Sequence, residues 1–450
     1  MARPLICIVL AAGAGTRMKS GLAKPLYPLA HRPMIDHVLA ATATLSPSQT
    51  LIVTSKALRK DLSGRKAKVI VQHPPRGTGD AVRTALKDLA RLRDADVIIT
   101  YADTPLISAQ SLKKIVRRLH NDAPGVLCTV RMQDQLQEFG RVMIDPAGHG
   151  QAVIEKKDLK GQDSPFGCAG LFGFRLSLLR GWLGRVRATG KEVYLTSVPA
   201  LAYKDKSPLY ALEIPFTEAL GVNSQTDLAR AEGLMQERLR AQAMARGVRL
   251  MDPASTFLAA DTVLGRDVTI EPFVMIGPGV RIDAGAYLYC GCRIEHTHLR
   301  RGASLGPFCV ARGGTVLRTR ASLGSFVEAK NADLAPGAKA RHLAYLGDTV
   351  IGKDVNIGAG VITCNYDGFQ KHQTTIKPGA FIGSNSALIA PVQIGKNSVV
   401  GAGTIVTRDI PADAIALTRP NLELRPGAAK RRRWQKNKSL HQNKTPKSSA

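Results

Sequence analysis

The second half of the chain contains a six-residue repeat, and no other feature limits its fold as strongly. A six-residue period is too short for a solenoid of helix pairs, and each aliphatic position can stack on its equivalent in neighbouring coils. The repeat therefore predicts a left-handed parallel β-helix. Its marker is an aliphatic residue followed by glycine, found between about Met251 and Ile415 at Leu264-Gly265, Ile276-Gly277, Ile351-Gly352, Ile357-Gly358, Ile382-Gly383, Ile394-Gly395 and Val400-Gly401.

The length of one coil also follows from the repeat. Leu305 and Leu323 lie eighteen residues apart, which is three hexads, one for each side of a triangular coil. From Ile357 to Ile382 the spacing is twenty-five residues, so about seven residues must loop out near residues 363–368. Loops that leave a solenoid tend to have a function. Acyltransferases dominate among such solenoids, but this is an analogy of fold alone.

The first half alternates short aliphatic runs with segments of helical spacing. This order is typical of a doubly wound, Rossmann-like α/β sheet, which binds ligands at the carboxyl ends of its strands. Nearly continuous apolar runs are expected of parallel strands that are buried on both faces. The expected strands are residues 5–10, 51–54, 68–72, 97–101 and 126–130, and the expected helices are 33–45, 79–92 and 108–120.

A capping-box sequence, Asn-Ser-Gln-Thr-Asp at residues 223–227, marks the start of a further helix. Apolar residues at Leu228, Ala231, Met235 and Leu239 give this helix one apolar face, and it should end at Gly247. We therefore expect four parts: a sheet domain over residues 1–222, a linker helix over 223–247, a β-helix domain over 248–420 and a basic, disordered tail over 421–450.

The formal net charge of +28 favours anionic ligands such as nucleotides, sugar phosphates, coenzyme A or nucleic acid. Part of the excess lies in the polar tail, which opens with four basic residues at 430–433 and cannot bury a core. The alternative to a solubilising tail is an arm that binds RNA or a membrane. No segment is long and apolar enough to span a membrane, and no secretory signal precedes the first strand. Seven scattered cysteines do not form a disulfide framework, so we expect a cytoplasmic protein.

A glycine-containing turn follows the first predicted strand. Small residues there let backbone N–H groups approach a phosphate, and Arg17 can add a charge-assisted contact. The turn is neither a dinucleotide fingerprint, because Met18 replaces the third glycine, nor a Walker A loop. A tight structural turn is the alternative to a phosphate loop. The segment is residues 10–18, Leu-Ala-Ala-Gly-Ala-Gly-Thr-Arg-Met.

Three further motifs favour a nucleotide site: Lys-Pro-Leu at residues 24–26, Gln72 with Gly-Thr-Gly at 77–79, and Tyr-Ala-Asp-Thr-Pro-Leu at 101–106. Together with the phosphate loop they resemble the sugar-nucleotidyltransferase (pyrophosphorylase) family. With the β-helix added, the similarity covers about residues 5–420. It narrows to the bifunctional N-acetylglucosamine-1-phosphate uridylyltransferase/glucosamine-1-phosphate N-acetyltransferase family.

This resemblance implies that an oxygen of N-acetylglucosamine-1-phosphate attacks the α-phosphorus of UTP and releases pyrophosphate. It places Mg²⁺ on Asp103 and Asn223, and the phosphates on Arg17 and Lys24. Two protein ligands are enough for Mg²⁺, which keeps most of its waters. The remaining positions implied for UTP or UDP-N-acetylglucosamine are Leu10, Ala11, Ala12, Gly13, Gln72, Gly77, Thr78, Tyr101, Ala102, Gly140 and Glu155.

Two positions depart from the family pattern. Cys168 stands where the family has an Asn that contacts the sugar nucleotide, and a thiol is a weak donor that cannot replace an amide. Losing one such contact costs about 1 kcal/mol, so sugar recognition should weaken without loss of catalysis. Ala14 replaces a residue that is basic in many relatives, which removes one positive charge near the triphosphate.

For the second half, the resemblance implies acetyl transfer from acetyl-CoA to glucosamine-1-phosphate in a homotrimer. His342 would be the general base, since an imidazole can accept the proton of the attacking amine near neutral pH. Arg312 and Lys330 would bind the sugar phosphate, and Tyr345, Asn356 and Glu328 would contact the sugar or orient the base. Acetyl-CoA or oxyanion positions would be Ala359, Asn365, Tyr366, Lys371, Ser384, Ala402 and Arg419.

Three alternatives stay open at this point. Cys290, Cys292, His296 and His298 have a spacing that suits zinc, although stacked solenoid side chains explain it better. A catalytically inactive scaffold or nucleic-acid binder would use the basic surface alone. A single-activity acetyltransferase with an impaired first domain is the stronger rival, because of Cys168.

Overall fold

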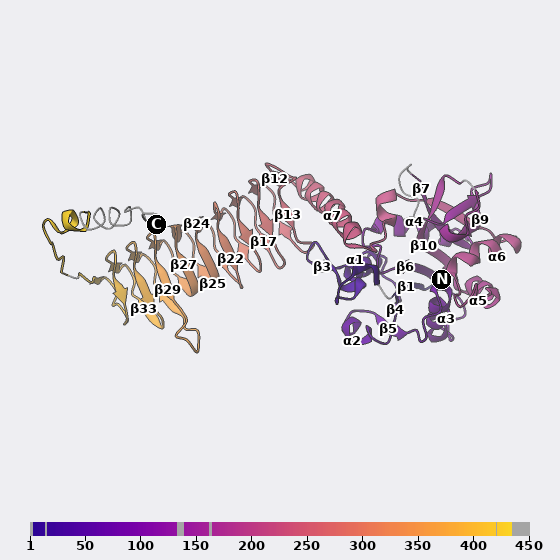
Figure 1. Ribbon diagram of the computed structural model, residues 1–450, viewed down its shortest axis with the longest axis horizontal. Helices are drawn as coiled ribbons and strands as arrows, with labels where there is room; N and C mark the ends of the chain where they lie inside the picture. The colour runs from indigo at the N-terminus through magenta and orange to yellow at the C-terminus, as the bar shows by residue number, and fades with distance from the viewer. Residues whose placement is uncertain (1–2, 14–15, 133–138, 162–163, 420, 434–450) are drawn as a thin grey trace, which may run out of the picture. The chain divides into compact units, whose positions relative to one another are not determined.

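The computed structural model describes residues 3–13, 16–132, 139–161, 164–419 and 421–433 (Figure 1). The chain forms two compact units, Met1–His298 and Leu299–Ala450. The first unit contains the sheet domain, a long helix and the first coils of the solenoid, and the second contains the remaining coils. The predicted boundaries at residues 222 and 248 stay predictions. No helix in the described ranges is long and apolar enough to cross a membrane.

The sheet domain is built on a nine-stranded sheet in the order β5-β4-β1-β6-β10-β7-β11-β9-β8. The predicted parallel strands are present, but the sheet is mixed, because β10 runs antiparallel to both β6 and β7. The strands are β1 (Leu5–Ala11), β4 (Gln49–Thr54), β5 (Lys68–Val71), β6 (Asp96–Tyr101), β7 (Gly125–Arg131), β8 (Arg141–Ile144), β9 (His149–Ile154), β10 (Phe166–Arg175) and β11 (Leu209–Glu213), with a separate hairpin of β2 (Pro28–Leu29) and β3 (Arg32–Pro33).

Helices cover both faces of this sheet, as a doubly wound fold requires. Alternate residues of β1 point to opposite layers: Ile8 packs in the core with α3 and α5, whereas Cys7 packs with α4. Each buried strand therefore supports two cores at once. The helices of the domain are α1 (Met34–Ala43), α2 (Arg59–Leu62), α3 (Thr78–Asp88), α4 (Ala109–His120), α5 (Leu176–Arg185) and α6 (Val198–Lys204).

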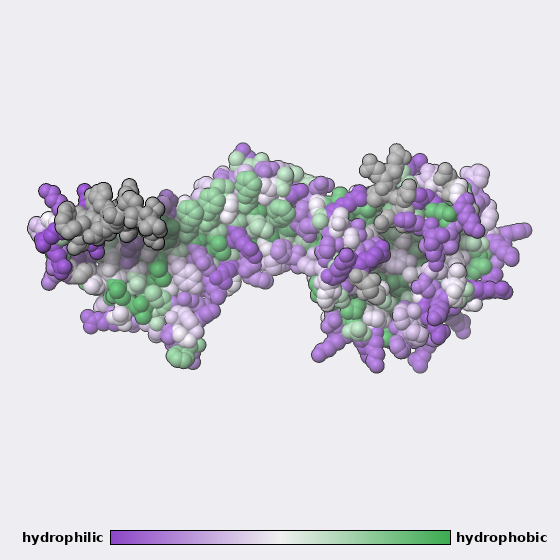
Figure 2. Space-filling view, viewed as in Figure 1, coloured by the Kyte–Doolittle hydropathy of each residue, from purple (hydrophilic) through white to green (hydrophobic). Residues whose placement is uncertain are grey.

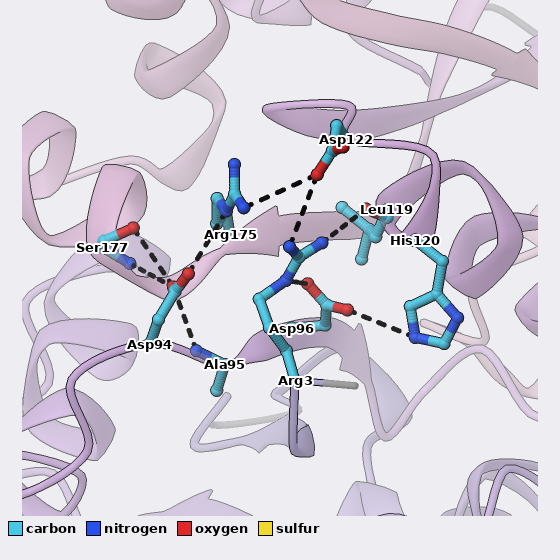
Figure 3. A network of polar contacts seen from close by, with 9 residues as sticks. All are labelled: Arg3, Asp94, Ala95, Asp96, Leu119, His120, Asp122, Arg175 and Ser177. Atoms are coloured by element: carbon cyan, nitrogen blue, oxygen red, sulfur yellow. Dashed lines mark hydrogen bonds and ion pairs between the residues drawn. The ribbon is translucent and has the colours of Figure 1, made fainter. Parts of the chain in front are cut away.

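A network of polar contacts closes the amino ends of β1 and β6 (Figure 3). The Arg3 guanidinium lies 2.8 Å from the fully buried carboxylate of Asp96 and also donates to the carbonyl of Leu119 at the end of α4. Asp122 joins this cluster to Arg175 of β10 through contacts with both arginines. A buried charge is tolerated only when it is paired. The network therefore stabilises the end of the sheet that lies opposite the phosphate loop.

The long helix α7 (Gln225–Ala245) begins where the sequence predicts. Ser224 is its N-cap, and the side chains of Ser224 and Asp227 form the expected capping box. Ala231 and Met235 are buried on its apolar face against Leu29 and Met34 of the sheet domain. The helix ends at Ala245, two residues before the predicted end.

The solenoid consists of short parallel strands stacked in register. The inward residue of most strands is aliphatic and buried, for example Leu258 stacked on Ile276. Strands from the first unit are β12 (Arg249–Leu250), β13 (Phe257–Leu258), β14 (Val263–Leu264), β15 (Thr269–Ile270), β16 (Met275–Ile276), β17 (Arg281–Ile282), β18 (Tyr287–Leu288) and β19 (Arg293–Ile294), and β20 (His298–Leu299) follows them.

The registers confirm the predicted coil lengths. Leu305 pairs with Leu323, eighteen residues on, and Ile357 pairs with Ile382, twenty-five residues on. One coil is shorter, because Leu323 pairs with Ala340 after only seventeen residues. The strands of the second unit are β21 (Ser304–Leu305), β22 (Val310–Arg312), β23 (Val316–Leu317), β24 (Ser322–Ser325), β25 (Glu328–Leu334), β26 (Lys339–His342), β27 (Tyr345–Ile351), β28 (Asn356–Ile357), β29 (Ile362–Cys364), β30 (Thr374–Ile376), β31 (Phe381–Ile382), β32 (Ala387–Ile389), β33 (Val392–Ile394), β34 (Val399–Val400), β35 (Ile405–Val406) and β36 (Ile415–Ala416).

The seven extra residues form a small hairpin between β29 and β30, visible in Figure 1 as a loop that leaves the coils. Tyr366 and Lys371 pair as an antiparallel bridge, and the backbone N–H of His372 donates to the carbonyl of Asn365 at 2.8 Å. The Asp367 carboxylate accepts two backbone N–H groups in the turn. Of the predicted disordered tail, residues 434–450 lie outside the described residues.

Candidate active sites

Two oxygens and two cations meet at the carboxyl ends of the sheet strands. Asp103 follows β6, and its carboxylate lies 2.5 Å from the ammonium of Lys24. The same ammonium donates to Oδ1 of Asn223 at 2.8 Å, and Arg17 donates to that oxygen at 3.0 Å. Four residues that the sequence predicts for metal and phosphate binding are thus brought together from three separate segments.

Local structure fixes both oxygen ligands. The backbone N–H of Val222 donates to the carbonyl of Asp103 at 2.8 Å, which ties the segment before α7 to the end of β6. The Asp227 carboxylate accepts the backbone N–H groups of Asn223 and Ser224 as part of the capping box. The capping box therefore places Asn223 as well as starting the helix.

These oxygens suit a divalent cation. A carboxylate and an amide oxygen are the ligand types that Mg²⁺ prefers, and here both already contact one positively charged group. In the described part of the chain, no three or more His, Cys, Asp or Glu side chains converge on a common point. A site at Asp103 and Asn223 would therefore be completed by phosphate oxygens and water, as Mg²⁺ allows.

A cavity of about 460 Å³ opens beside this cluster. It has the size expected for a small-molecule ligand. All four positions predicted to line the sugar, Tyr101, Gly140, Glu155 and Cys168, lie in its wall. The complete lining is Thr78, Tyr101, Asp103, Thr104, Phe139, Gly140, Val153, Glu155, Cys168, Ala169, Gly170, Tyr194, Thr196, Ala219, Leu220, Gly221, Asn223, Asp227 and Arg230.

Thr78, Asp103 and Asn223 also lie in this wall, whereas several other predicted nucleotide positions lie outside it. Leu10 and Ala102 meet where β1 and β6 end, since the N–H of Ala102 donates to the carbonyl of Leu10 at 2.9 Å. Gly13 is exposed, and added side-chain atoms there would meet nothing within 4 Å. Ala14 and Gly15, the centre of the predicted phosphate loop, lie outside the described residues. Ala11 and Ala12 lie between these points at the end of β1.

Gln72 is buried, and its amide orientation is fixed by its neighbours. Its Nε2 donates to the carbonyl of Gly77 at 3.1 Å and to the carboxylate of Asp80 at 2.9 Å. Both partners are acceptors only, so the amide nitrogen must face them and Oε1 must face the other way. That oxygen can accept from the N–H of a uracil. Thr78 begins α3 beside it, and its hydroxyl accepts the backbone N–H of Leu195.

Cys168 lies in an irregular part of β10. The register of β10 against β7 shifts between Cys168 and Phe172, and Gly170 adopts a left-handed φ of 69°. A Cβ at Gly170 would lie 3.0 Å from the ring of Tyr101, so glycine allows this close approach. Burial raises the pKa of Cys168 to about 12. The side chain is therefore a neutral thiol at physiological pH, and a poor hydrogen-bond donor in the sugar cavity.

The cavity also contains residues that the sequence analysis did not assign. The hydroxyl of Thr196 donates to Glu155 at 2.5 Å, so it orients that carboxylate. Asp227 and Arg230 reach the wall from the first turns of α7. Asp227 and Arg230 are three residues apart on one helix face and close to Asn223 in sequence, so the sequence could have indicated them as wall residues. No sequence signal marks Thr196, because it lies far from the motifs.

In the solenoid, the predicted phosphate-binding residues are stacked. Arg312 and Lys330 are register partners in adjacent coils, and Arg312 lies 2.5 Å from the carboxylate of Glu328. Lys371 reaches this place from the hairpin. The contact with Lys371 lowers the pKa of Lys330, and the charge of Arg312 lowers it further. Three cations gathered in this way give the place a positive charge that suits a phosphate dianion.

His342 ends β26 and is exposed, and in the described chain its ring has no hydrogen-bond partner. Its register partner is Ser325 in the preceding coil. Tyr345 follows His342 at the start of β27 and is in register with Glu328, which starts β25 in the preceding coil. Asn356 lies in the next coil, beside Lys339. The structure thus groups these predicted sugar and base positions on neighbouring strands.

The predicted acetyl-CoA positions follow one corner of successive coils. Backbone hydrogen bonds link Asn385 to the carbonyl of Ala359 and Gly403 to the carbonyl of Ser384. The guanidinium of Arg419 donates to the carbonyl of Ala402 at 3.0 Å. These positions are far apart in sequence but form one row in space. Asn365, Tyr366 and Lys371 lie in the hairpin.

Two family models match the two halves of the chain. Residues 7–161 match the MobA-like NTP transferase domain, and residues 373–408 match the bacterial transferase hexapeptide repeat. Curated relatives called "Bifunctional protein GlmU" match almost the whole chain. The relative from Sphingopyxis alaskensis is 41% identical over 439 residues, covering 96% of this chain and 97% of the relative.

Two further relatives with that name agree. The one from Paramagnetospirillum magneticum is 40% identical and covers 92% of this chain and 93% of its own length. The one from Zymomonas mobilis is 36% identical and covers 97% and 99%. The predicted combination of a nucleotidyltransferase fold with a left-handed hexapeptide β-helix is confirmed. The chain belongs to the family of bifunctional GlmU proteins, enzymes that join a nucleotidyltransferase domain to a hexapeptide-repeat transferase domain.

Proposed function

We propose that this enzyme catalyses the two last steps in the synthesis of UDP-N-acetylglucosamine. In the solenoid, the acetyl group of acetyl-CoA is transferred to the amine of glucosamine-1-phosphate. In the sheet domain, a phosphate oxygen of N-acetylglucosamine-1-phosphate attacks the α-phosphorus of UTP and pyrophosphate leaves. One observation carries the proposal for the sheet domain: the oxygens of Asp103 and Asn223 converge on one cation beside a cavity of about 460 Å³.

Uridylyl transfer needs positioning and charge neutralisation more than covalent chemistry. Asp103 and Asn223 would hold Mg²⁺, which when bound supplies positive charge to the phosphates. Lys24 and Arg17 carry their charges on long side chains that reach the same place, where the phosphates of UTP would bind. Gln72 would accept from uracil, and Glu155 would accept from hydroxyl groups of the sugar.

Acetyl transfer requires that the amine be neutral when it attacks the thioester carbonyl. As the C–N bond forms and the C–S bond breaks, His342 would accept the amine proton, and the coenzyme A thiolate would leave. Arg312, Lys330 and Lys371 would bind the sugar phosphate, while Asn365 and the row of Ala359, Ser384 and Ala402 would contact acetyl-CoA.

The proposal includes a homotrimer formed through the solenoid. Large apolar side chains are exposed on its coils: Phe308 and Phe326 are 52% and 59% exposed and stack with ring centroids 5.5 Å apart. Figure 2 shows that hydrophobic residues gather on the visible face of the coils. Exposed apolar surface of this kind supports association between copies. We place both reactions in the cytoplasm, as the free thiols of Cys128, Cys168 and Cys364 favour.

The test is to assay one purified preparation for both reactions. Formation of UDP-N-acetylglucosamine from UTP, N-acetylglucosamine-1-phosphate and Mg²⁺ reports the first domain, and release of free thiol from acetyl-CoA with glucosamine-1-phosphate reports the second. We expect both products. Acetyl transfer alone would support the single-activity alternative, which no observation of the molecule favours. Absence of both products would overturn the proposal.

A further inference from the structure

One carboxylate, that of Asp348 in β27, contacts two side-chain amides at once, and one of them, Asn365, belongs to the proposed acetyl-transfer site. Its Oδ1 accepts from the side-chain amide of Asn331 at 2.7 Å, and its Oδ2 accepts from that of Asn365 at 2.5 Å. The three residues lie seventeen positions apart in sequence and form a ladder along successive coils. Because a carboxylate only accepts, both amides must present their N–H groups to it and turn their oxygens away.

The backbone next to Asp348 is shaped to admit Asn365. Asp348 and Asn331 both have left-handed φ values, 45° and 52°, which Asp and Asn tolerate better than most residues. The preceding residue is Gly347. A Cβ there would lie 2.6 Å from the amide nitrogen of Asn365 and 2.7 Å from the hydroxyl of Tyr345. The Gly347-Asp348 pair therefore both clears the space for the Asn365 amide and holds it.

Asp348 also acts on the cations of the same site. The contact with Lys371 is the main cause that lowers the pKa of Lys330, and the charge of Arg312 adds to it. The charge of Asp348 acts in the opposite direction. The other nearby carboxylate, Glu328, already pairs with Arg312. Lys330 is in register with Gly347, the residue before Asp348, so the carboxylate of Asp348 lies near this lysine.

Asp348 itself stays ionised. Burial acts to raise its pKa, but the hydrogen bonds from Asn331 and Asn365 and the charges of Lys371 and Lys330 lower it below the usual value for an aspartate. The negative charge is therefore present at every pH at which the enzyme would work. Its effect on the two lysines is correspondingly constant across that range.

We propose that Asp348 is a positioning residue for acetyl transfer. It orients the amide of Asn365 toward the acyl donor, and it places a negative charge beside Lys330 of the proposed phosphate site. It contacts neither reacting group. The inference rests on the acetyl-transfer function proposed above, and it adds a residue that links the acyl-donor side of that site to its phosphate side.

The test is Asp348→Asn, which keeps the size of the side chain but removes its charge and one acceptor. A hydrogen bond to a charged group is worth about tenfold or more in an equilibrium constant, and the bond weakened here holds Asn365, so KM for acetyl-CoA should rise by about that factor. Without the carboxylate, Lys330 should also lose its proton at lower pH. The alkaline limb of kcat/KM for the sugar should therefore move to lower pH.

Asp333→Asn is the matched control. Asp333 lies in β25 and makes two hydrogen bonds to Arg318, at 2.8 and 2.7 Å, but contacts neither lysine. This variant should keep the wild-type KM and pH profile, and Asp348→Glu should restore much of the pH profile by restoring the charge. Uridylyl transfer, measured on the same preparations, should be unchanged in all three variants and reports that the chain is folded.

A folded Asp348→Asn enzyme with wild-type KM and pH profile would overturn the inference, and so would an equal loss in Asp333→Asn. Binding of acetyl-CoA, measured by calorimetry, separates this inference from the proposed function. If the wild type transfers no acetyl group, the proposed function fails. The inference then still requires that Asp348→Asn bind acetyl-CoA about tenfold more weakly, and equal binding would contradict it.

Discussion

The two sites of the molecule gather positive charge in opposite ways. In the sheet domain, Lys24 and Arg17 are already engaged with the oxygens of Asp103 and Asn223. In the solenoid, Lys330 faces another cation, Lys371, and its pKa is lowered by that contact. The first arrangement needs an added cation before it can neutralise a triphosphate. In the second arrangement, a bound phosphate directly reduces the repulsion between the two ammonium groups, because the anion lies between two like charges.

The sites differ in enclosure as well. The sheet domain surrounds a cavity, and burial raises the pKa of Cys168 and of Tyr101 in its wall. In the solenoid, His342 is exposed and Tyr366 is 61% exposed. A closed pocket can recognise a sugar through walls that one chain supplies. An open row of coils can enclose the reacting groups only if a long substrate or another copy of the chain covers them, which agrees with the proposed trimer.

The largest expected effect is the loss of acetyl transfer in His342→Ala. Removal of a general base typically costs about 10²–10⁴-fold in rate. The loss should fall on kcat more than on KM, because the proton moves only on the way to the transition state. Uridylyl transfer should continue in the same variant, whose oligomeric state should match that of the wild type. A variant that keeps more than about half of the wild-type kcat at neutral pH would exclude His342 as the base.

The second largest effect is expected on uridylyl transfer in the sheet domain. Asp103→Ala should lower Mg²⁺-dependent uridylyl transfer by about 10²–10³-fold, the usual cost of removing one group that stabilises charge in the transition state. Acetyl transfer should persist. The exposed carboxylate of Asp61 provides a control, and Asp61→Ala should leave the Mg²⁺ titration of activity unchanged. If a folded Asp103→Ala variant lost both activities, the two sites would not be independent.

The fold could be predicted well from sequence because its signals are local and repeated. Hexads fix the register of the solenoid, so the twenty-five-residue step between Ile357 and Ile382 was found by counting. The antiparallel direction of β10 was not found, because the chain between β7 and β10 has no pattern that fixes direction. Most helix and strand ends were predicted to within two residues, as at the end of α7, but α3 ends at Asp88, four residues before its predicted end.

The candidate sites were predicted where motifs exist and missed where only folding brings residues together. Asp103 and Asn223 are 120 positions apart, but each lies in a recognisable segment, and the structure joins them through Lys24. Thr196 and Asp348 had no such signal. Each acts by orienting another residue, Glu155 or Asn365, and that role is visible only from atomic contacts. Contacts of this kind are formed by the packing of distant segments.

A smaller effect concerns the cation pair in the solenoid. Since Lys371 lowers the pKa of Lys330, Lys330 should lose its charge at a lower pH than an ordinary lysine. KM for glucosamine-1-phosphate should therefore begin to rise with pH before lysines usually titrate, near 10.4. Lys371→Gln removes the repelling charge and should move this rise to higher pH. A rise at the same pH in both proteins would show that the two ammonium groups do not interact.

The smallest expected effect tests the sugar cavity. Cys168→Asn should lower KM for N-acetylglucosamine-1-phosphate by about fivefold, since one neutral hydrogen bond is worth about 1 kcal/mol. The wild-type thiol is neutral, with a pKa of about 12, and lies in the same wall as Glu155 and Tyr101. An amide there can both donate and accept. The contact would be made in ground and transition states alike, so kcat should change little.

Cys168→Ala is the matched control and should leave KM near the wild-type value, because a weak donor is lost and none is gained. An unchanged or raised KM in Cys168→Asn would show that another group, such as Thr196, already satisfies the sugar.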